Sequence, residues 1–305
     1  MKILIVGKNG QIGHELTHWL RRIDGHPMQV VALERSQLDL ENPVQVREVV
    51  DRVRPEVIVN AAAYTAVDLA EQDDRLAMRI NGDAVGEIAR AARRCGAALI
   101  HYSSDYVFDG IKDRPYVEND ATNPINAYGR SKVAGEEAIR ASGVAYLILR
   151  TSWVYGMRGK NFLKTIQRLA AERDELAIVA DQFGAPTWSR TVAQQTACVL
   201  TRLCRRSQRG HAGQAAVIGA AAWEDYGGVY HLTAQGHTTW HGLANAILRN
   251  AAPTQDIRVR PILSENHPAS ARRPRNSRLS CERFMQCFGN LPAWEIALAS
   301  CLQET

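Results

Sequence analysis

The sequence predicts an α/β fold: a doubly wound parallel sheet with a smaller C-terminal lobe. Two features of residues 1–150 favour this class. Short apolar runs alternate with longer segments whose apolar residues recur at helical spacing, and a glycine-rich turn follows the first run. Strands that alternate with helices indicate βαβ units, and their right-handed crossovers place helices on both faces of a parallel sheet.

The predicted strands and helices follow one another in a regular order. Strands are expected at residues 2–6, 30–33, 57–59, 98–102 and 146–149. Helices are expected at residues 11–22, 43–53, 75–95 and 127–141. Asn42 is the expected N-cap before Pro43 in the second helix, and Gly96 is the expected stop after the third.

The pattern becomes less regular in the second half of the chain. A helix is expected at 191–205 and a strand at 229–232, whereas 184–187 is expected to be a loop. Residues 207–228 are rich in Gly and Ala and have the composition of an insertion. Residues 267–278 hold four Arg and two Pro, which makes this segment too polar for a core.

Composition excludes several classes of protein. The chain has 305 residues, 46% hydrophobic and 23% charged, which is ordinary for a globular protein and argues against disorder. A net charge of +5, spread along the chain, suits anionic small ligands and predicts no nucleic-acid partner. The first apolar run is too short for a signal peptide, and no run is long enough to span a membrane. Six cysteines without a C-x-x-C pair predict reduced thiols, so we expect a cytoplasmic protein.

Three glycines mark a predicted dinucleotide site after the first strand. They are spaced G-x-x-G-x-x-G, with Gln11 and Ile12 opening the helix between the last two: Gly7, Gly10 and Gly13. The first glycine permits a tight turn, the second lets the backbone approach a pyrophosphate, and the third lets helix and strand pack closely. The helix N-terminus adds free N–H groups for the phosphates. We therefore predict a Rossmann domain that binds NAD(P).

We predict a division of the chain into two parts. Residues 1–150 form the Rossmann domain, and part of 187–235 returns to it. Residues 151–186 and 236–305 form the smaller lobe, which binds the substrate.

The second strand ends in two residues of opposite charge that bear on the choice of cofactor. Glu34 is placed to bind the adenosine ribose hydroxyls of NADH, whereas Arg35 can pair with the 2′-phosphate of NADPH. Either side chain also fits a solvated loop charge. The sequence therefore predicts NADPH or NADH without choosing between them.

A tyrosine and a lysine one helical turn apart form the predicted catalytic pair. Tyr128 and Lys132 are a Y-x-x-x-K motif on the fourth helix, and this spacing places both on one face. A nearby ammonium lowers the pKa of a phenol, which can then protonate a carbonyl oxygen as hydride reaches the carbon. The lysine can also hold the nicotinamide ribose. Ser104 follows the fourth strand, where ligands bind in open α/β sheets, although a strand-ending turn also suits it.

With these motifs the chain resembles the extended short-chain dehydrogenases/reductases, and among them the nucleotide-sugar reductases. The glycine and Y-x-x-x-K elements are shared by the superfamily. The segments around Trp153 and around Arg272 and Arg273 are more specific to the reductases. The resemblance runs through nearly the whole chain and is carried by residues 7–13, 38–40, 59–68, 105–110, 127–132, 150–156, 181–187 and 271–279.

The resemblance implies a reaction and roles for further residues. NADPH or NADH would deliver hydride to C4 of dTDP-4-dehydro-L-rhamnose, giving dTDP-L-rhamnose, with Tyr128 as the proton donor. Trp153 would pack on the sugar ring and the two arginines would meet the pyrophosphate, although a core tryptophan and a solvated basic loop also fit these residues. Further cofactor contacts are implied for Asp39, Leu40, Ala63, Tyr64 and Thr65, and substrate contacts for Ser104, Asp105, Trp153, Arg272 and Arg273.

One departure from the family bears on metal binding. Some members bind Mg²⁺ at a dimer contact through acidic residues that follow the segment matching 184–187. Here residues 188–191 contain no carboxylate, so we predict no metal site. A homodimer is compatible with the sequence, but the missing metal site removes one reason to expect it.

Two other functions are compatible with the fold. Nucleotide-sugar dehydratases of this superfamily place Asp-Glu after the residue that matches Ser104, whereas this chain has Asp105 and Tyr106; an epimerase would retain its nicotinamide through each cycle. A non-catalytic binding subunit, such as the regulatory subunit of methionine adenosyltransferase, keeps the fold without the catalytic pair. The presence of Tyr128, Lys132 and Ser104 argues against it.

Overall fold

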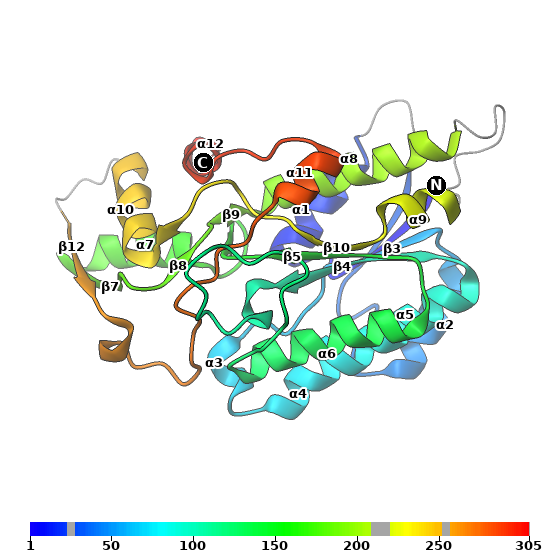
Figure 1. Ribbon diagram of the computed structural model, residues 1–305, viewed down its shortest axis with the longest axis horizontal. Helices are drawn as coiled ribbons and strands as arrows, with labels where there is room; N and C mark the ends of the chain where they lie inside the picture. Colours follow the sequence, from blue (N-terminus) through cyan, green and yellow to red (C-terminus); the bar gives the residue numbers. More distant parts are fainter. Residues whose placement is uncertain (23–27, 209–219, 252–256, 305) are drawn as a thin grey trace.

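A sheet of six parallel strands forms the centre of the molecule, in the spatial order β10-β5-β4-β3-β1-β2 (Figure 1). The computed structural model describes residues 1–22, 28–208, 220–251 and 257–304. Every pairing between neighbouring strands is parallel, which confirms the predicted doubly wound sheet. The strands are β1 (Lys2–Val6), β2 (Gln29–Leu33), β3 (Val57–Asn60), β4 (Ala98–Ser104), β5 (Tyr146–Thr151) and β10 (Gly228–His231).

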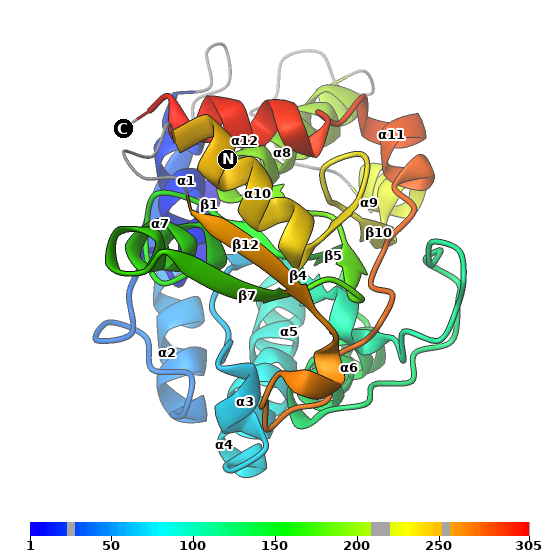
Figure 2. The same ribbon diagram turned by 90° about the vertical axis from the view of Figure 1, so that its left-hand side faces the viewer.

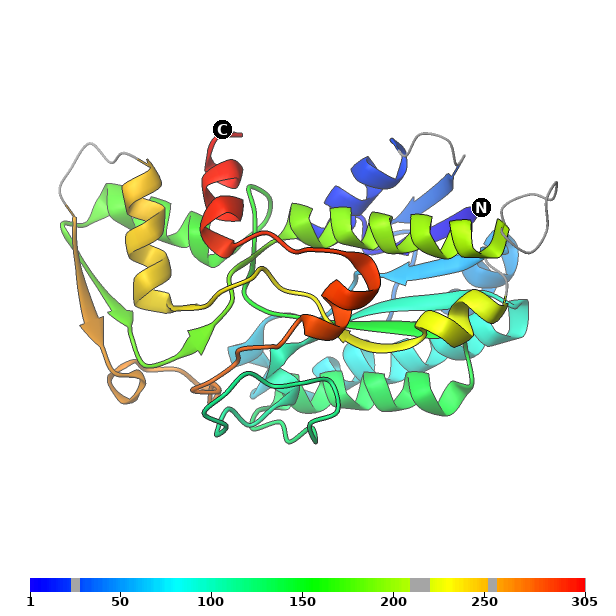
Figure 3. The ribbon, with the colours of Figure 1, turned by 45° about the horizontal axis from the view of Figure 1, so that its top comes forward.

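Helices cover both faces of the sheet (Figures 1 and 3). Alternate strand residues point to opposite faces, so Ile3 and Ile5 join one buried apolar cluster and Leu4 and Val6 join the other. The first cluster is covered by α1 (Gln11–Leu20), α8 (Ser189–Gln208), α9 (Ala220–Tyr226) and α11 (Glu282–Phe288). The second is covered by α2 (Pro43–Val53), α5 (Ala84–Cys95) and α6 (Ala127–Ser142). Asn42 caps α2 as predicted, accepting hydrogen bonds from the amides of Val44 and Gln45.

The helix predicted at 75–95 is interrupted by a wider turn. It consists of α4 (Asp74–Met78), the π-helical turn η1 (Arg79–Asp83) and α5. In this turn the Asn81 amide bonds the backbone N–H and C=O of Tyr64, each at 2.9 Å, and donates to Ser131 Oγ at 3.0 Å. The apolar spacing did not predict the extra residue of a π-turn. Through Asn81, this turn connects the loop after β3 to helix α6.

A separate apolar cluster holds together the elements beyond the carboxyl ends of the strands, which face the viewer in Figure 2. Two of its strands are far apart in sequence, yet they pair in parallel: β7 (Glu175–Val179) and β12 (Arg258–Ile262). They pack with α7 (Phe162–Glu172), α10 (Trp240–Ala251) and α12 (Trp294–Leu302). The predicted loop at 184–187 begins in β8 (Phe183–Gly184) and ends in β9 (Thr187–Trp188). These two-residue strands pair with β11 (Thr238–Thr239) and β6 (Val154–Tyr155), respectively.

The chain crosses between these parts more than once. After β9 it returns to the sheet as α8, α9 and β10, and residues 209–219 of the predicted insertion lie outside the described part. It returns again as α11, where Phe284 and Phe288 contact Tyr230 of β10. Among the described helices, none is both long enough and apolar enough to cross a membrane.

Candidate active site

A cavity of about 770 Å³ lies beyond the carboxyl ends of the central strands. Its wall includes the turn after β1, the ends of β2 and β3, the end of β4, the first turns of α6, and residues of 151–161 with Trp240. The sheet order reverses between β1 and β3, and open α/β sheets bind ligands at such a switch point. The cavity is therefore in the place where a parallel sheet of this topology binds its ligands.

The glycine turn forms one end of the cavity. Gly7 has φ +90°, a conformation that side chains disfavour, and a Cβ on Gly13 would lie 2.1 Å from the Gly7 carbonyl oxygen. Gly10 is the N-cap of α1 and provides no side-chain cap, so the first N–H groups of the helix are available to a ligand. Gly7, Gly10, Gln11 and Ile12 line the cavity, whereas Gly13 lies behind them and lets the turn and helix approach.

The charged residues after β2 are engaged with neighbouring side chains. Glu34 accepts hydrogen bonds from Asn9 at 2.6 Å and Ser36 at 3.0 Å, and these bonds, with the charge of Lys8, lower the pKa of the Glu34 carboxyl. Arg35 is 74% exposed and pairs with Glu41 at 2.5 Å. Both residues line the cavity, so a carboxylate and a guanidinium are both present at this end.

The other residues expected to contact the cofactor lie along the same wall. Asp39 and Leu40 follow β2, and the Asp39 amide donates to Gln45 Oε1 at 2.7 Å. Residues 63–65 follow β3, held through Asn81 as described above. The lining includes each of the expected residues: Asp39, Leu40, Ala63, Tyr64 and Thr65.

Tyr128 enters the cavity from the first turn of α6. The helix begins there because Asn126 caps it, accepting a hydrogen bond from the Gly129 amide at 2.7 Å. Burial raises the pKa of the Tyr128 phenol to about 12, a hydrogen bond with the Ser104 hydroxyl lowers it, and the charge of Asp105 raises it. The phenol therefore holds its proton at neutral pH, which is the state that a proton donor needs.

Lys132 is fully buried one turn further along α6. Its Nζ donates to the Tyr102 carbonyl oxygen at 2.7 Å and lies 3.3 Å from His101 Nε2. Burial lowers the pKa of the Lys132 ammonium to about 8, and the charge of Glu136 raises it. Tyr128 and Lys132 both line the cavity. In the described structure no hydrogen bond joins their side chains. Helical spacing predicted their common face, but it did not predict that His101 would contact the lysine.

Asp105 is a buried carboxyl at the end of β4. Its Oδ1 accepts a hydrogen bond from the Ser104 hydroxyl at 3.0 Å. Burial raises the pKa of the Asp105 carboxyl to about 7, and hydrogen bonds, with Ser277 first, lower it. Asp105 can therefore present either a donor or an acceptor to a ligand near neutral pH.

Asp105→Asn is expected to raise the free energy of unfolding in a pH-dependent way. The pKa of Asp105 in the folded protein lies above its ordinary value of 3.8. The protonated carboxyl therefore contributes fully to stability below pH 3.8, and this contribution is lost as the pH rises through about 7. The neutral amide avoids this loss. Urea unfolding should show a gain of roughly 2–4 kcal/mol above pH 7 that vanishes near about pH 4.

Asp109→Asn is the matched control for this measurement. Burial raises the pKa of Asp109, but hydrogen bonds led by that of Tyr116 outweigh it and hold the pKa below its ordinary value. Asp109 therefore contributes stability above its unfolded pKa and loses it as pH falls. A stability change with the same sign and pH dependence in both variants would contradict the explanation by burial.

Two tryptophans form the wall beside the catalytic residues. Trp153 follows β5 with φ +46°, and its ring stacks on Trp240 at 3.6 Å with an interplanar angle of 7°. Trp240 begins α10 and packs in turn on Phe162, 4.7 Å away. A Cβ on Gly184 would come within 2.4 Å of the Trp153 ring, so only glycine leaves room for this placement. The family resemblance indicated Trp153 but not Trp240, because the two meet only in the folded chain.

Arg272 and Arg273 are not in the cavity wall. Arg273 pairs with Asp68 at 2.6 Å, and Arg272 is exposed, with its carbonyl oxygen accepting a hydrogen bond from Asn126 at 2.8 Å. The family resemblance implied that the two arginines meet a pyrophosphate, but a carboxylate from α3 (Val67–Ala70) neutralises one of them. The remaining cavity residues include Lys160 and Asn161, which sequence patterns did not indicate.

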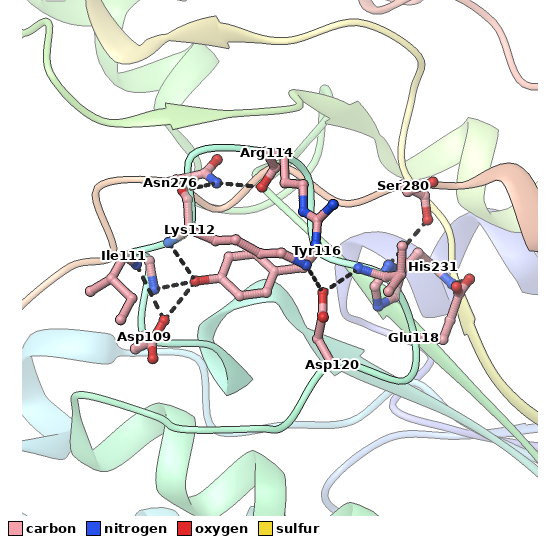
Figure 4. A network of polar contacts seen from close by, with 12 residues as sticks. Asp109, Ile111, Lys112, Arg114, Tyr116, Glu118, Asp120, His231, Asn276 and Ser280 are labelled. Atoms are coloured by element: carbon pink, nitrogen blue, oxygen red, sulfur yellow. Dashed lines mark hydrogen bonds and ion pairs between the residues drawn. The ribbon is translucent and has the colours of Figure 1, made fainter.

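The segment that holds these arginines is less exposed than its composition predicts. Asn276 is buried and donates to the carbonyl oxygens of Lys112 and Arg114 at 2.7 and 2.9 Å (Figure 4). In the same network the Tyr116 hydroxyl donates to Asp109 and accepts from the Gly110 amide. The segment therefore fastens the loop between β4 and α6, because its polar groups are paired with backbone.

Arg190 lies in the segment 188–191, where the family resemblance raised Mg²⁺ and the sequence has no carboxylate. Its Nε donates to Glu15 at 3.0 Å and its other end pairs with Glu304. A guanidinium between two carboxylates supplies the positive charge there, so these residues do not fit a divalent cation. Within the described residues, no cluster of three or more His, Cys, Asp or Glu could hold a metal ion.

Comparison with known proteins gives full-length matches. The family model described as RmlD substrate binding domain matches residues 1–305. A dTDP-4-dehydrorhamnose reductase of Burkholderia thailandensis is 47% identical, covering 100% of this chain and 99% of the relative. A dTDP-4-dehydrorhamnose reductase structure from Clostridium acetobutylicum has a TM-score of 0.88 at 33% identity, covering 100% and 99% of the two chains. The Bacillus anthracis enzyme of that name, solved with NADP, has a TM-score of 0.85 at 33% identity and the same coverage.

Proposed function

Since this chain belongs to the family described as RmlD substrate binding domain, we propose that it reduces dTDP-4-dehydro-L-rhamnose to dTDP-L-rhamnose with NADPH or NADH. One observation supports this most strongly: the glycine turn, Tyr128, Lys132 and Ser104 line a single cavity in a chain that matches such reductases over its full length. The enzyme is an oxidoreductase of dTDP-rhamnose synthesis.

The residues around the glycine turn suit a dinucleotide. A side chain on Gly7 or Gly13 would collide with backbone, and the uncapped start of α1 offers N–H groups to a pyrophosphate. Glu34 and Arg35, which line the cavity, would lie at the adenosine end, where the first favours NADH and the second NADPH. When bound, the nicotinamide supplies the hydride. Lys132 would hold its ribose, and residues 63–65 would lie against its inner face.

Tyr128 and Ser104 would act on the ketone oxygen. Tyr128 donates its phenolic proton as the C4 oxygen gains negative charge, and the Ser104 hydroxyl orients that oxygen by a hydrogen bond. Asp105 would bind a sugar hydroxyl and Trp153 a C–H face of the ring. For the nucleotide end, Arg272 and Arg273 stay candidates for the pyrophosphate; Arg273 would have to leave Asp68.

The proposed reaction has a direct test. Purified protein is expected to consume NADPH or NADH in the presence of dTDP-4-dehydro-L-rhamnose, in equal amount to the dTDP-L-rhamnose formed. An epimerase would instead keep its cofactor through gel filtration and show no net consumption. Unchanged substrate and cofactor would favour a non-catalytic binding subunit and contradict the proposal. A homodimer and a cytoplasmic location stay predictions, and light scattering tests the first.

Trp240→Ala is expected to raise the KM for the sugar nucleotide by roughly 2- to 10-fold, since a stacked aromatic pair contributes about 0.5–1.5 kcal/mol beyond buried area. Without this partner the strained Trp153 loses the ring that fixes its orientation. The KM for NADPH should not change, because the glycine turn lies elsewhere in the cavity. Trp240→Phe keeps a stacking ring and serves as the control; an equal loss in both variants would contradict the stacking explanation.

A further inference from the structure

A buried histidine and asparagine lie behind Lys132, and the proposed reaction uses neither of them. His101 is on β4 and Asn60 ends the neighbouring strand β3, where the two are paired in register. Their side chains are 0% and 1% exposed. Asn60 Nδ2 lies 3.1 Å from His101 Nδ1, and His101 Nε2 lies 3.3 Å from Lys132 Nζ. The three residues therefore form a chain of polar contacts from the sheet to the cavity.

The hydrogen-bond partners determine which nitrogen of His101 carries the proton. The Ala62 amide is a donor and lies 3.2 Å from Asn60 Oδ1, which fixes the carbonyl end of the Asn60 amide there. The amino end of Asn60 then donates to His101 Nδ1. Burial and the nearby Lys132 charge hold the pKa of His101 well below its ordinary value, so the ring is neutral. A neutral ring that accepts at Nδ1 carries its proton on Nε2.

This tautomer turns an N–H donor toward Lys132. An ammonium has three donors and no acceptor, so an Nε2–H group facing it is a contact between two donors. An uncharged amine has a lone pair that accepts this hydrogen. The carboxylate of Glu136 on α6 is also close to the amine; it favours the ammonium but is itself bound by Arg150. Tyr102 contributes a carbonyl oxygen, which accepts from either form.

We propose that Asn60 and His101 are positioning residues for the reductase site: they hold the His101 Nε2–H against Lys132, favour its amine form, and direct its remaining hydrogens into the cavity. This role rests on the proposed reduction. After Tyr128 gives its proton to the ketone oxygen, Lys132 in the ammonium form can give one proton to the phenolate by way of a water molecule. The N–H bond breaks and the phenolic O–H forms, and one proton from solvent then restores the ammonium. A partner that stabilises the amine favours this exchange.

Nitrogen-15 NMR of the histidine rings tests the tautomer without any assay of activity. The His101 signals, assigned by their loss in His101→Gln, are expected to show a proton on Nε2 and none on Nδ1. Asn60→Asp replaces the amino group with an acceptor and should move the proton to Nδ1. A proton on Nδ1 of His101 in the unaltered protein would overturn the inference, whether or not the protein proves to be a reductase.

The pH dependence of kcat tests the effect on Lys132. Glutamine can turn its carbonyl oxygen toward the ammonium, so His101→Gln should move the basic limb of the profile upward by on the order of one pH unit. His231→Gln removes another fully buried histidine, which bonds the Ser280 carbonyl oxygen, and should leave the limb in place. An unmoved limb in His101→Gln, or equal movement in both variants, would show that His101 is structural only. Activity of the unaltered protein separates this outcome from failure of the proposed function.

Discussion

Replacing Tyr128 with Phe is expected to lower kcat for the reduction by about two to four orders of magnitude, the usual contribution of a positioned acid. The phenol is half-buried and lines the cavity beside Ser104. It keeps its proton at neutral pH, because desolvation raises its pKa to about 12. Phe retains the ring but offers no proton to the ketone oxygen. Stopped-flow absorbance of NADPH with a saturating sugar nucleotide measures the loss.

Tyr106→Phe is the matched control for this loss. Tyr106 lies edge-on to Tyr128, with ring centroids 5.8 Å apart, and it also lines the cavity. Because its hydroxyl bonds Arg273 and has no part in the proposed proton transfer, its removal should change kcat far less. The KM for NADPH should be unaffected in both variants. Equal kcat for Tyr128→Phe and the unaltered protein would overturn the proposed mechanism.

The shared position of Tyr128, Lys132 and the glycine turn in one cavity could be predicted because their signals are local in the sequence. A glycine turn and a Y-x-x-x-K helix each place their groups within a few residues, so strand and helix geometry is enough to bring them to one side of the sheet. The parallel sheet was predicted for the same reason, since each strand and crossover helix has its own apolar pattern.

The remaining site residues depend on contacts between distant segments. Trp240 reaches Trp153 only when α10 packs beside the segment after β5, and β7 and β12 give no sign of their pairing in sequence. His101 is one residue of a fully buried strand, and it contacts Lys132 because α6 crosses β4. Conversely, the family resemblance implied that Arg273 meets a pyrophosphate, but in the fold Arg273 pairs with Asp68. Local spacing identifies the groups that can do chemistry, whereas tertiary packing decides what each of them contacts.

Removing either member of the buried pair Glu136–Arg150 is expected to lower the free energy of unfolding by about 3–5 kcal/mol. Arg150 Nε and its terminal nitrogen donate to the two carboxylate oxygens of Glu136 at 2.8 and 2.7 Å, and both side chains are at most 2% exposed. Arg150 also lies over the Phe108 ring, 5.0 Å from its centroid. Glu136→Gln or Arg150→Met leaves one buried charge without its partner, and that desolvated charge is the cause of the loss.

The double variant Glu136→Leu/Arg150→Met shows whether the loss of stability in the single variants comes from the unpaired charge or from lost packing. With both charges removed, it should unfold at a higher urea concentration than either Glu136→Leu or Arg150→Met alone, because apolar replacements can substitute for a buried pair. Losses that simply add would contradict this account. Arg140, which also contacts Glu136, is 39% exposed and can turn to solvent.

The same pair connects stability to the catalytic lysine. Glu136 lies one turn after Lys132, and its charge raises the pKa of the Lys132 ammonium. Glu136→Gln removes this contribution and leaves Arg150 positively charged nearby, so the basic limb of kcat should move to lower pH. This direction is opposite to that expected for His101→Gln. Partial unfolding would not move the basic limb in opposite directions in two destabilised variants. Opposite movements in Glu136→Gln and His101→Gln would therefore assign both to the protonation of Lys132.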